Sequence, residues 1–191
     1  LQSVGSAAVT APFTAVKDTE CIILIGARPE QNHPVAASYL KQAIKNGSKL
    51  IIMDPRKQNL SRYATHHLQF NPGQDLALLN AMIHVIIKEN LINKDYIKNH
   101  TEGFHILEKE IEKFNPSMME DLCGINKDII RDVARIYAKA KSSIIFWGMG
   151  ISQHVHGTQN AFSLINLALI TGHLGKPVSY THLTLPTKQA V

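Results

Sequence analysis

The stretch Cys21-Ile22-Ile23-Leu24-Ile25-Gly26-Ala27-Arg28-Pro29-Glu30-Gln31-Asn32-His33-Pro34 decides how this chain folds. Its apolar opening, Cys21–Ile25, is short and rich in β-branched residues, which predicts a buried strand. The proline of His33-Pro34 is typical of the first turn of a helix, and Asn46-Gly47 predicts the end of that helix. A second apolar run follows at Leu50–Met53. The pattern therefore predicts two parallel strands joined by a helix in a right-handed crossover.

Strands and helices alternate along most of the chain. The pattern predicts a third strand at His67–Phe70, an amphipathic helix at Gln74–Glu89 and a fourth strand at Ser143–Phe146. An apolar helix is predicted at Gly157–Leu174, and about residues 91–140 are almost wholly helical. The sequence therefore predicts a three-layer α/β domain with a doubly wound, mostly parallel, Rossmann-like sheet and a helical insertion between its third and fourth strands.

The composition describes one globular domain. The chain has 191 residues, a net charge of +5 and a hydrophobic fraction of 45%, which is enough for one core. No apolar run approaches the roughly 20 residues of a membrane span, and no leader pattern is visible, although the first residue, Leu1, suggests a start further upstream. Basic residues are scattered among acids, without the basic block that nucleic-acid binding favours. We expect a cytoplasmic domain with no membrane segment and no nucleic-acid partner.

The cysteines and histidines do not predict a metal site. Cys21 and Cys123 lack a CxxC partner, so we expect two free, buried thiols in a reducing compartment. His154 and His156 have the spacing of a metal pair on a strand, but no third ligand lies nearby in the sequence. We interpret them as surface or site-lining histidines, and we predict no catalytic or metal-binding residue in this chain.

The loops after the four predicted strands carry the candidate ligand residues, because the carboxyl ends of such strands converge on one edge of the sheet. Glycines let backbone N–H groups approach a phosphate, and arginine binds phosphate through two hydrogen bonds. An acidic residue after the second strand is typical of a ribose or base contact. The candidates are Gly26, Arg28, Gln31, Asn32 and His33 in the first loop, Asp54, Pro55 and Arg56 in the second, Asn71, Gly73, Gln74 and Asp75 in the third, and Gly148, Gly150 and Gln153 in the fourth.

Each loop also has a purely structural interpretation. Gly26 could form a tight turn, and Asp54-Pro55 could cap one. Gln74-Asp75 could cap the following helix without binding a ligand, and Trp147 could be a core residue. Residue types and spacing alone predict a nucleotide-type ligand in an α/β domain, without a nucleophile or a general base.

The same loops and the following helices carry motifs in a specific order. They include Gly26-x-x-Pro29-x-x-Asn32-His33-Pro34-Val35, Gly47-x-Lys49-Leu50-Ile51-x-x-Asp54-Pro55-Arg56, Trp147-Gly148-Met149-Gly150-x-x-Gln153 and Gly172-x-Leu174-Gly175-Lys176-Pro177. Together they resemble the molybdopterin oxidoreductase family, and within it most closely the formate dehydrogenase catalytic (alpha) subunit. The resemblance covers about residues 1–177.

The resemblance implies an internal fragment of a larger enzyme. That enzyme would hold molybdenum or tungsten between two molybdopterin guanine dinucleotides, contain a 4Fe-4S cluster, and oxidise formate to carbon dioxide. Its electrons would pass to an electron-transfer subunit or a ferredoxin-type partner. The metal ligand, the cluster cysteines and the substrate-orienting arginine would all lie outside this stretch, so the fragment alone is expected to be inactive. By position, the resemblance assigns cofactor binding to Gly26, Arg28, Gln31, Asp54, Pro55, Arg56, Gly73, Asp75, Gly148, Met149 and Gln153.

The chain departs from the family pattern at two positions, and the sequence also allows two other functions. Arg28 stands where the family commonly has Asn, and Gln31 stands where it commonly has an acid. The chain could instead belong to a non-catalytic relative in a respiratory redox complex, or it could be a stand-alone nucleotide-binding module.

The end of the chain differs in character from the rest. Residues 178–191 resemble the translation of a sequencing adapter, so we assign the cofactor-binding domain to residues 1–177 and exclude the tail. The alternative is a natural C-terminal strand.

Overall fold

One parallel sheet organises the protein. The computed structural model describes residues 13–174 and 180–182, and within them the sheet has the strand order β3-β2-β1-β4-β5. Every neighbouring pair of strands is parallel. The strands are β1 (Cys21–Ile25), β2 (Lys49–Met53), β3 (His66–Leu68), β4 (Ser143–Trp147) and β5 (Tyr180–His182).

Both faces of the sheet are buried because the central strands are apolar throughout. In β1, Ile23 and Ile25 belong to one hydrophobic core, whereas Ile22 and Leu24 belong to the other. Successive side chains of a strand point to opposite faces, so an unbroken apolar run requires cover on both sides.

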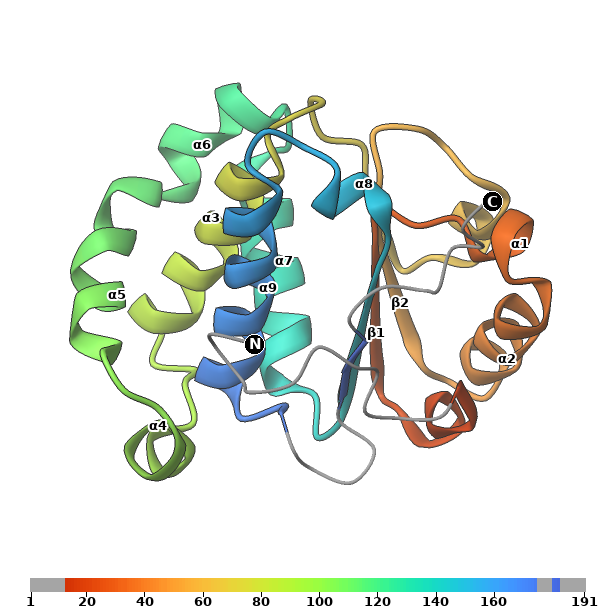
Figure 1. The fold of residues 1–191 in the computed structure, drawn as a ribbon, viewed down its shortest axis with the longest axis horizontal. Coiled ribbons are helices and arrows are strands. Elements are labelled where there is room, and N and C mark those ends of the chain that lie inside the picture. Colours follow the sequence, from red (N-terminus) through yellow and green to blue (C-terminus); the bar gives the residue numbers. More distant parts are fainter. Residues whose placement is uncertain (1–12, 175–179, 183–191) are drawn as a thin grey trace, which may run out of the picture.

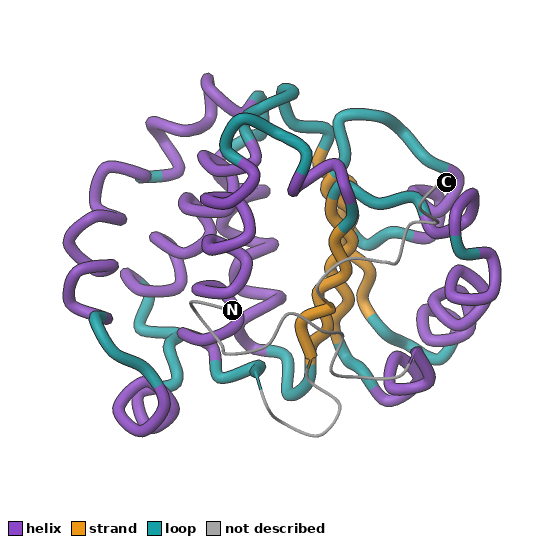
Figure 2. The backbone as a smooth tube through the Cα atoms, viewed as in Figure 1, coloured by secondary structure: helices purple, strands orange, loops and turns teal. Residues whose placement is uncertain are grey.

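Helices supply this cover in two unequal layers (Figures 1 and 2). One face carries η1 (Phe13–Asp18), α1 (Pro29–Asn32), α2 (Pro34–Lys45) and η2 (Asn59–Tyr63). The other face carries α3 (Asp75–Lys88), α7 (Lys127–Lys139) and α9 (Gly157–Thr171). Of the remaining helices, η3 (Ile111–Phe114) and α6 (Pro116–Cys123) pack on α3, α4 (Lys94–His100) packs on α9, and α5 (Phe104–Glu110) packs on η3. The short α8 (Met149–Ser152) follows β4.

The predicted fold class is confirmed, with differences in detail. The third strand is β3 at His66–Leu68, and it ends at Leu68 because the paired strand β2 ends at Met53. The short helices α1 and α8 form within segments that the sequence predicts as loops. The fifth strand, β5, lies inside the segment 178–191, and the domain boundary at residue 177 stays a prediction.

Candidate functional site

The sheet order brings the loops after β1 and β4 side by side. β1 lies between β2 and β4, so the sheet winds in one direction from β1 to β3 and in the other from β1 to β5. In an open α/β sheet, ligands bind beyond the carboxyl ends of the strands at such a reversal. We call this end of the sheet the carboxyl edge and the opposite end the amino edge.

Three glycines let these two loops pack backbone against backbone. A Cβ atom at Gly150 would lie 2.7 Å from the carbonyl oxygen of Gly26, and a Cβ atom at Gly148 would lie 2.8 Å from the same oxygen. The glycine N–H groups are already bonded, since Gly150 donates to Gly26 at 3.1 Å and Gly26 donates to Met53 at 3.2 Å. The sequence predicts that these N–H groups face a phosphate, whereas the structure uses these glycines for close packing of the loops.

Other N–H groups of these loops are available to a ligand. The N–H groups of Arg28 and Met149 donate to no carbonyl group within the described part of the chain. Arg28 precedes α1, and Met149 is the first residue of α8. Both residues line the cavity described below, where their N–H groups can donate to an anion.

Both carboxylate oxygens of Asp54 are held in the loop after β2. Oδ1 accepts the Arg56 N–H at 2.8 Å, and Oδ2 accepts a hydrogen bond from Gln58 Nε2 at 3.2 Å. The first bond closes a turn, so Asp54 does cap a turn as the structural interpretation proposes. Gln58 Nε2 also donates to the Ala27 carbonyl at 3.3 Å, which ties the second loop to the first. A carboxylate has further lone pairs that can accept from a ligand.

A second buried carboxylate belongs to Asp75, the first residue of α3, which is only 3% exposed. Burial raises the pKa of Asp75, the nearby His154 counteracts part of this rise, and the charge of Asp54 adds to it. Gln74 is the N-cap of α3 but makes no side-chain capping bond. An N–H donor from a ligand would stabilise the charged form of Asp75, which burial disfavours in the folded chain.

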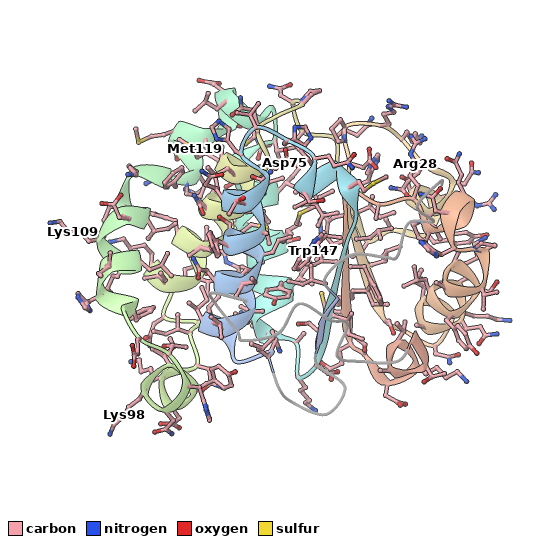
Figure 3. The ribbon with its side chains drawn as sticks, viewed as in Figure 1. Arg28, Asp75, Lys98, Lys109, Met119 and Trp147 are labelled. Atoms are coloured by element: carbon pink, nitrogen blue, oxygen red, sulfur yellow. The ribbon has the colours of Figure 1, made fainter. Side chains whose placement is uncertain are left out.

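These loops line a cavity of about 450 Å³, which we call the carboxyl-edge cavity. This volume is within the range of small-molecule sites, roughly 300–1,000 Å³. Figure 3 shows Arg28 and Asp75 toward this end of the molecule. Every residue that the family resemblance assigns to the cofactor lines the cavity except Gln31 and Gln153. The residues from that set that line it are Gly26, Arg28, Asp54, Pro55, Arg56, Gly73, Asp75, Gly148 and Met149.

Gln31 and Gln153 do not line the cavity, and each lies in or directly after a short helix. Gln31 is part of α1 and borders a separate hollow of about 90 Å³ beside Gln58. Gln153 directly follows α8, and its N–H donates to the Met149 carbonyl at 2.9 Å. The sequence predicts both segments as loops, so it could not show which of their residues line the cavity.

The cavity also contains residues that sequence analysis did not assign to a ligand. Phe70 and Pro72 line it from the loop after β3, and their place beside Gly73 was the available signal. His154 also lines it, which agrees with its interpretation as a site-lining histidine. Trp147 is 1% exposed and belongs to the hydrophobic core, as its structural interpretation predicts.

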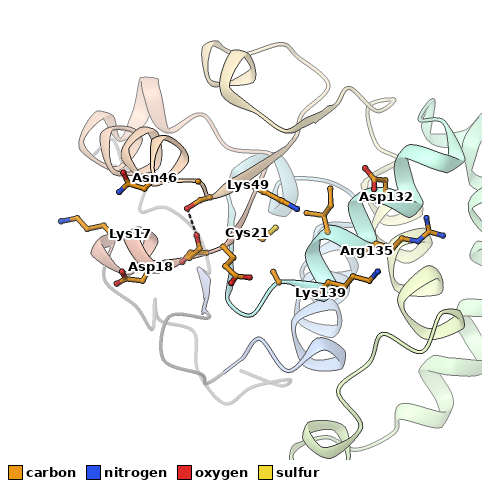
Figure 4. Close-up of a pocket in the computed structure, with 14 residues that line it drawn as sticks. Lys17, Asp18, Cys21, Asn46, Lys49, Asp132, Arg135 and Lys139 are labelled. Carbon is orange, nitrogen blue, oxygen red and sulfur yellow. Dashed lines mark hydrogen bonds between the residues drawn. The ribbon is translucent and has the colours of Figure 1, made fainter.

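A second cavity of about 630 Å³ lies at the amino edge of the sheet (Figure 4). Its lining includes Cys21 and Lys49, the first residues of β1 and β2, and Asp132, Arg135 and Lys139 of α7. Although this amino-edge cavity is larger, volume alone does not identify a ligand site. The chemistry of the lining groups decides between the two cavities.

Two charged groups of this lining are bound by residues outside it, and the other charged side chains are exposed, namely Lys17, Asp18, Glu20, Lys49 and Lys139. Arg135 binds both carboxylate oxygens of Glu89 at 2.7 Å, and Asp132 lies 3.0 Å from His66. Burial raises the pKa of Cys21 to about 12, so its thiol is unreactive near neutral pH. We therefore place the candidate site at the carboxyl edge.

Several further features bear on the kind of site. Cys21 and Cys123 are both free and buried, as predicted. Within residues 13–174 and 180–182, no group of three His, Cys, Asp or Glu side chains is placed to hold a metal ion. In the same residues, no helix combines the length and apolarity that crossing a membrane requires.

Comparison with known proteins identifies the family. A model of the molybdopterin oxidoreductase family matches residues 2–191. The chain belongs to the molybdopterin oxidoreductase family. The resemblance drawn from the loop motifs is thereby confirmed, and the carboxyl-edge cavity lies within the matched residues.

Individual relatives are much longer than this chain. Formate dehydrogenase H of Escherichia coli (strain K12) is 42% identical over 92% of the chain and 25% of its own length. The F420-dependent formate dehydrogenase subunit alpha of Methanocaldococcus jannaschii is 41% identical over 90% of the chain and 26% of its own length. Nitrate reductases also match, at 34% identity. The chain thus spans about a quarter of the length of the curated relatives it matches.

A solved structure has the same fold. Acetylene hydratase from Pelobacter acetylenicus matches with a TM-score of 0.83 and 25% sequence identity, over 92% of this chain and 23% of that chain. The α/β architecture described above is therefore also found within a much longer protein.

Proposed function

We propose that the carboxyl-edge cavity holds the guanine nucleotide end of a molybdopterin guanine dinucleotide. The single observation that carries this proposal is the joint presence of two buried carboxylates, Asp54 and Asp75, and two guanidinium groups, Arg28 and Arg56, around one cavity. Guanine presents adjacent N–H donors on one edge, which carboxylates can accept. Guanidinium groups bind the oxygens of a pyrophosphate.

The lining residues fit such a group in charge and in shape. Neither Arg28 nor Arg56 forms an ion pair with any residue that the structure describes. Phe70 and Pro72 supply an apolar wall against which the flat face of a base can lie. The cofactor, when bound, supplies the molybdenum or tungsten centre of the parent enzyme. The residues of this chain bind and orient its nucleotide, and none of them is proposed to be catalytic.

Calorimetric titration of the purified chain with GDP, ADP and pyrophosphate tests the nucleotide site. We expect GDP to bind more tightly than ADP, because only guanine offers two neighbouring donors to the carboxylates. Equal affinity for both nucleotides would contradict the guanine assignment. Absence of binding for all three ligands would contradict the nucleotide site itself.

We further propose that the parent protein is a formate dehydrogenase that contains two such dinucleotides and a 4Fe-4S cluster. The identities of 42% and 41% to formate dehydrogenases support this proposal. An electron-transfer subunit or a ferredoxin-type protein would accept the electrons. Cytoplasmic localisation belongs to the same proposal, since the free thiols fit a reducing compartment.

A nitrate reductase is the second candidate, favoured by the relatives at 34% identity. Purified parent protein that reduces a viologen dye with formate would support the first candidate. Oxidation of reduced viologen by nitrate, without formate activity, would support the second. A parent protein without molybdenum or tungsten by elemental analysis would instead indicate a non-catalytic relative.

A further inference from the structure

One residue beside the cavity is bound to the helical insertion instead of lining the cavity. Phe70, Pro72 and Gly73 line the carboxyl-edge cavity from the loop after β3, whereas Asn71 between them does not. The Asn71 N–H donates to the Cys123 carbonyl at 2.8 Å, and its side-chain Nδ2 donates to the Leu122 carbonyl at 2.9 Å. Asn71 therefore joins the ligand loop to the last turn of α6.

The end of α6 is suited to this contact. The last carbonyl groups of a helix lack partners within the helix, and two of them, on Leu122 and Cys123, accept from Asn71. The helix ends at Cys123, and the next residue, Gly124, has φ of 70°. A Cβ atom at Gly124 would lie 3.0 Å from Oδ1 of Asn71, so the asparagine side chain occupies the space that this glycine leaves.

Asn71 also shapes the start of α3. Its carbonyl accepts the Gln74 N–H at 3.1 Å, which closes the turn that leads to the buried Asp75. Asn71 is thus bonded within the turn that carries the cavity-lining residues Pro72, Gly73 and Asp75.

We propose that Asn71 is a positioning residue, which sets the geometry of the ligand loop by binding the C-terminal carbonyls of α6. Through this contact, the helical insertion contributes to ligand affinity although α6 does not line the cavity. The identity of the ligand rests on the proposed function above, whereas the contact itself does not.

The first test compares Asn71→Ala with Asn126→Ala. Asn126 caps α7 by accepting the Asp128 N–H at 2.9 Å, and its Nδ2 donates to Glu120 Oε1 of α6 at 2.9 Å. Its replacement therefore removes two asparagine hydrogen bonds close to the end of α6, neither of which involves Asn71. We expect Asn71→Ala to weaken GDP binding about fivefold and Asn126→Ala to leave GDP affinity unchanged. Equal losses in the two variants would overturn the proposal, because they would reflect stability alone.

The second test changes the residue after α6 that contacts the Asn71 side chain. Gly124→Ala and Gly103→Ala both place a side chain at positive φ in the insertion, at 70° and 73°. The nearest atom to a Cβ at Gly103 is 3.9 Å away, so only Gly124→Ala presses on Asn71. We expect Gly124→Ala, but not Gly103→Ala, to weaken GDP binding by about threefold or more. No difference between the two would also overturn the proposal.

Hydrogen exchange of the ligand-free chain tests the role of Asn71 independently of the function proposed above. In Asn71→Ala, amides of residues 70–75 should exchange about tenfold faster than in the unmodified chain, and in Asn126→Ala they should not. If GDP does not bind the unmodified chain, the nucleotide proposal fails, and the exchange rates still decide the role of Asn71. Unchanged exchange at residues 70–75 in Asn71→Ala would refute it.

Discussion

The carboxyl-edge cavity and the amino-edge cavity lie at opposite ends of the same strands and differ in the ion pairing and burial of their charged groups. At the amino edge, Arg135 and Asp132 are held by Glu89 and His66. At the carboxyl edge, Arg28 and Arg56 form no ion pair with the residues that the structure describes, and Asp75 is a buried carboxylate with a raised pKa. The smaller cavity combines two arginines without such an ion pair and two buried carboxylates, Asp54 and Asp75, whereas the remaining charged groups of the larger cavity are exposed. This difference indicates a ligand site better than volume does.

The largest expected effect is on the free energy of unfolding, when a methyl group is added where the loops after β1 and β4 meet. In Gly150→Ala, the new Cβ would collide with the backbone of Gly26, so we expect a loss of about 3 kcal/mol in the free energy of unfolding. At the amino edge, Gly47→Ala meets no atom within 4 Å, and only its φ of 104° is strained, which should cost about 1 kcal/mol. Urea denaturation measures both values, and equal losses would contradict the tight packing of the loops.

The next effect in size is a change in GDP affinity when a carboxylate is replaced, and it is expected at only one of the two cavities. Asp54→Asn places an amide group against the Gln58 amide and removes a charge, so GDP binding should weaken about tenfold. Asp132→Asn, at the amino edge, should leave GDP affinity unchanged. Calorimetry on both variants checks the contrast, and a loss in Asp132→Asn alone would move the site to the amino edge.

The hydrogen bonds of Gln58, which join the loops after β1 and β2, predict a smaller change in GDP affinity. Gln58→Leu removes the hydrogen bonds to Ala27 and Asp54, and it should weaken GDP binding about threefold. Arg135→Gln breaks a bidentate ion pair beside the amino-edge cavity, yet it should not alter this affinity. The reverse ranking of the two variants would contradict the assignment.

The smallest expected effect is a pH dependence that arises from Asp75. Its folded-state pKa is raised by burial, so the folded chain binds a proton more tightly than the unfolded chain. The free energy of unfolding therefore falls as pH rises from the ordinary value of 3.8 through the raised pKa. Asp75→Asn should remove this fall and thus gain stability relative to the unmodified chain over the same window. A difference that stays constant with pH would contradict the raised pKa.

The sequence predicts the sheet well because short runs of neighbouring residues are enough to indicate a strand. The apolar run Cys21–Ile25 is long enough for a strand and too short for a helix, and the glycine loops directly follow such runs. Their convergence follows from parallel strand topology, so most of the cavity lining could be predicted.

The contacts that shape the site could not be predicted in the same way. Asn71 binds Leu122 and Cys123, and these partners lie about fifty residues away in the sequence. Gln31 and Gln153 do not line the cavity, and they lie in or directly after short helices that form where loops are expected. The packing role of Gly148 and Gly150 depends on their approach to Gly26, which only the folded backbone shows.

An NMR titration of the labelled chain with GDP tests the central claim most directly, because it reports on both cavities at once. The account predicts that the amide signals of Arg28, Gly73 and Met149 shift on binding, while those of Gly47 and Lys49 at the amino edge stay in place. Shifts confined to the amino edge, with the carboxyl-edge signals unmoved, would contradict it.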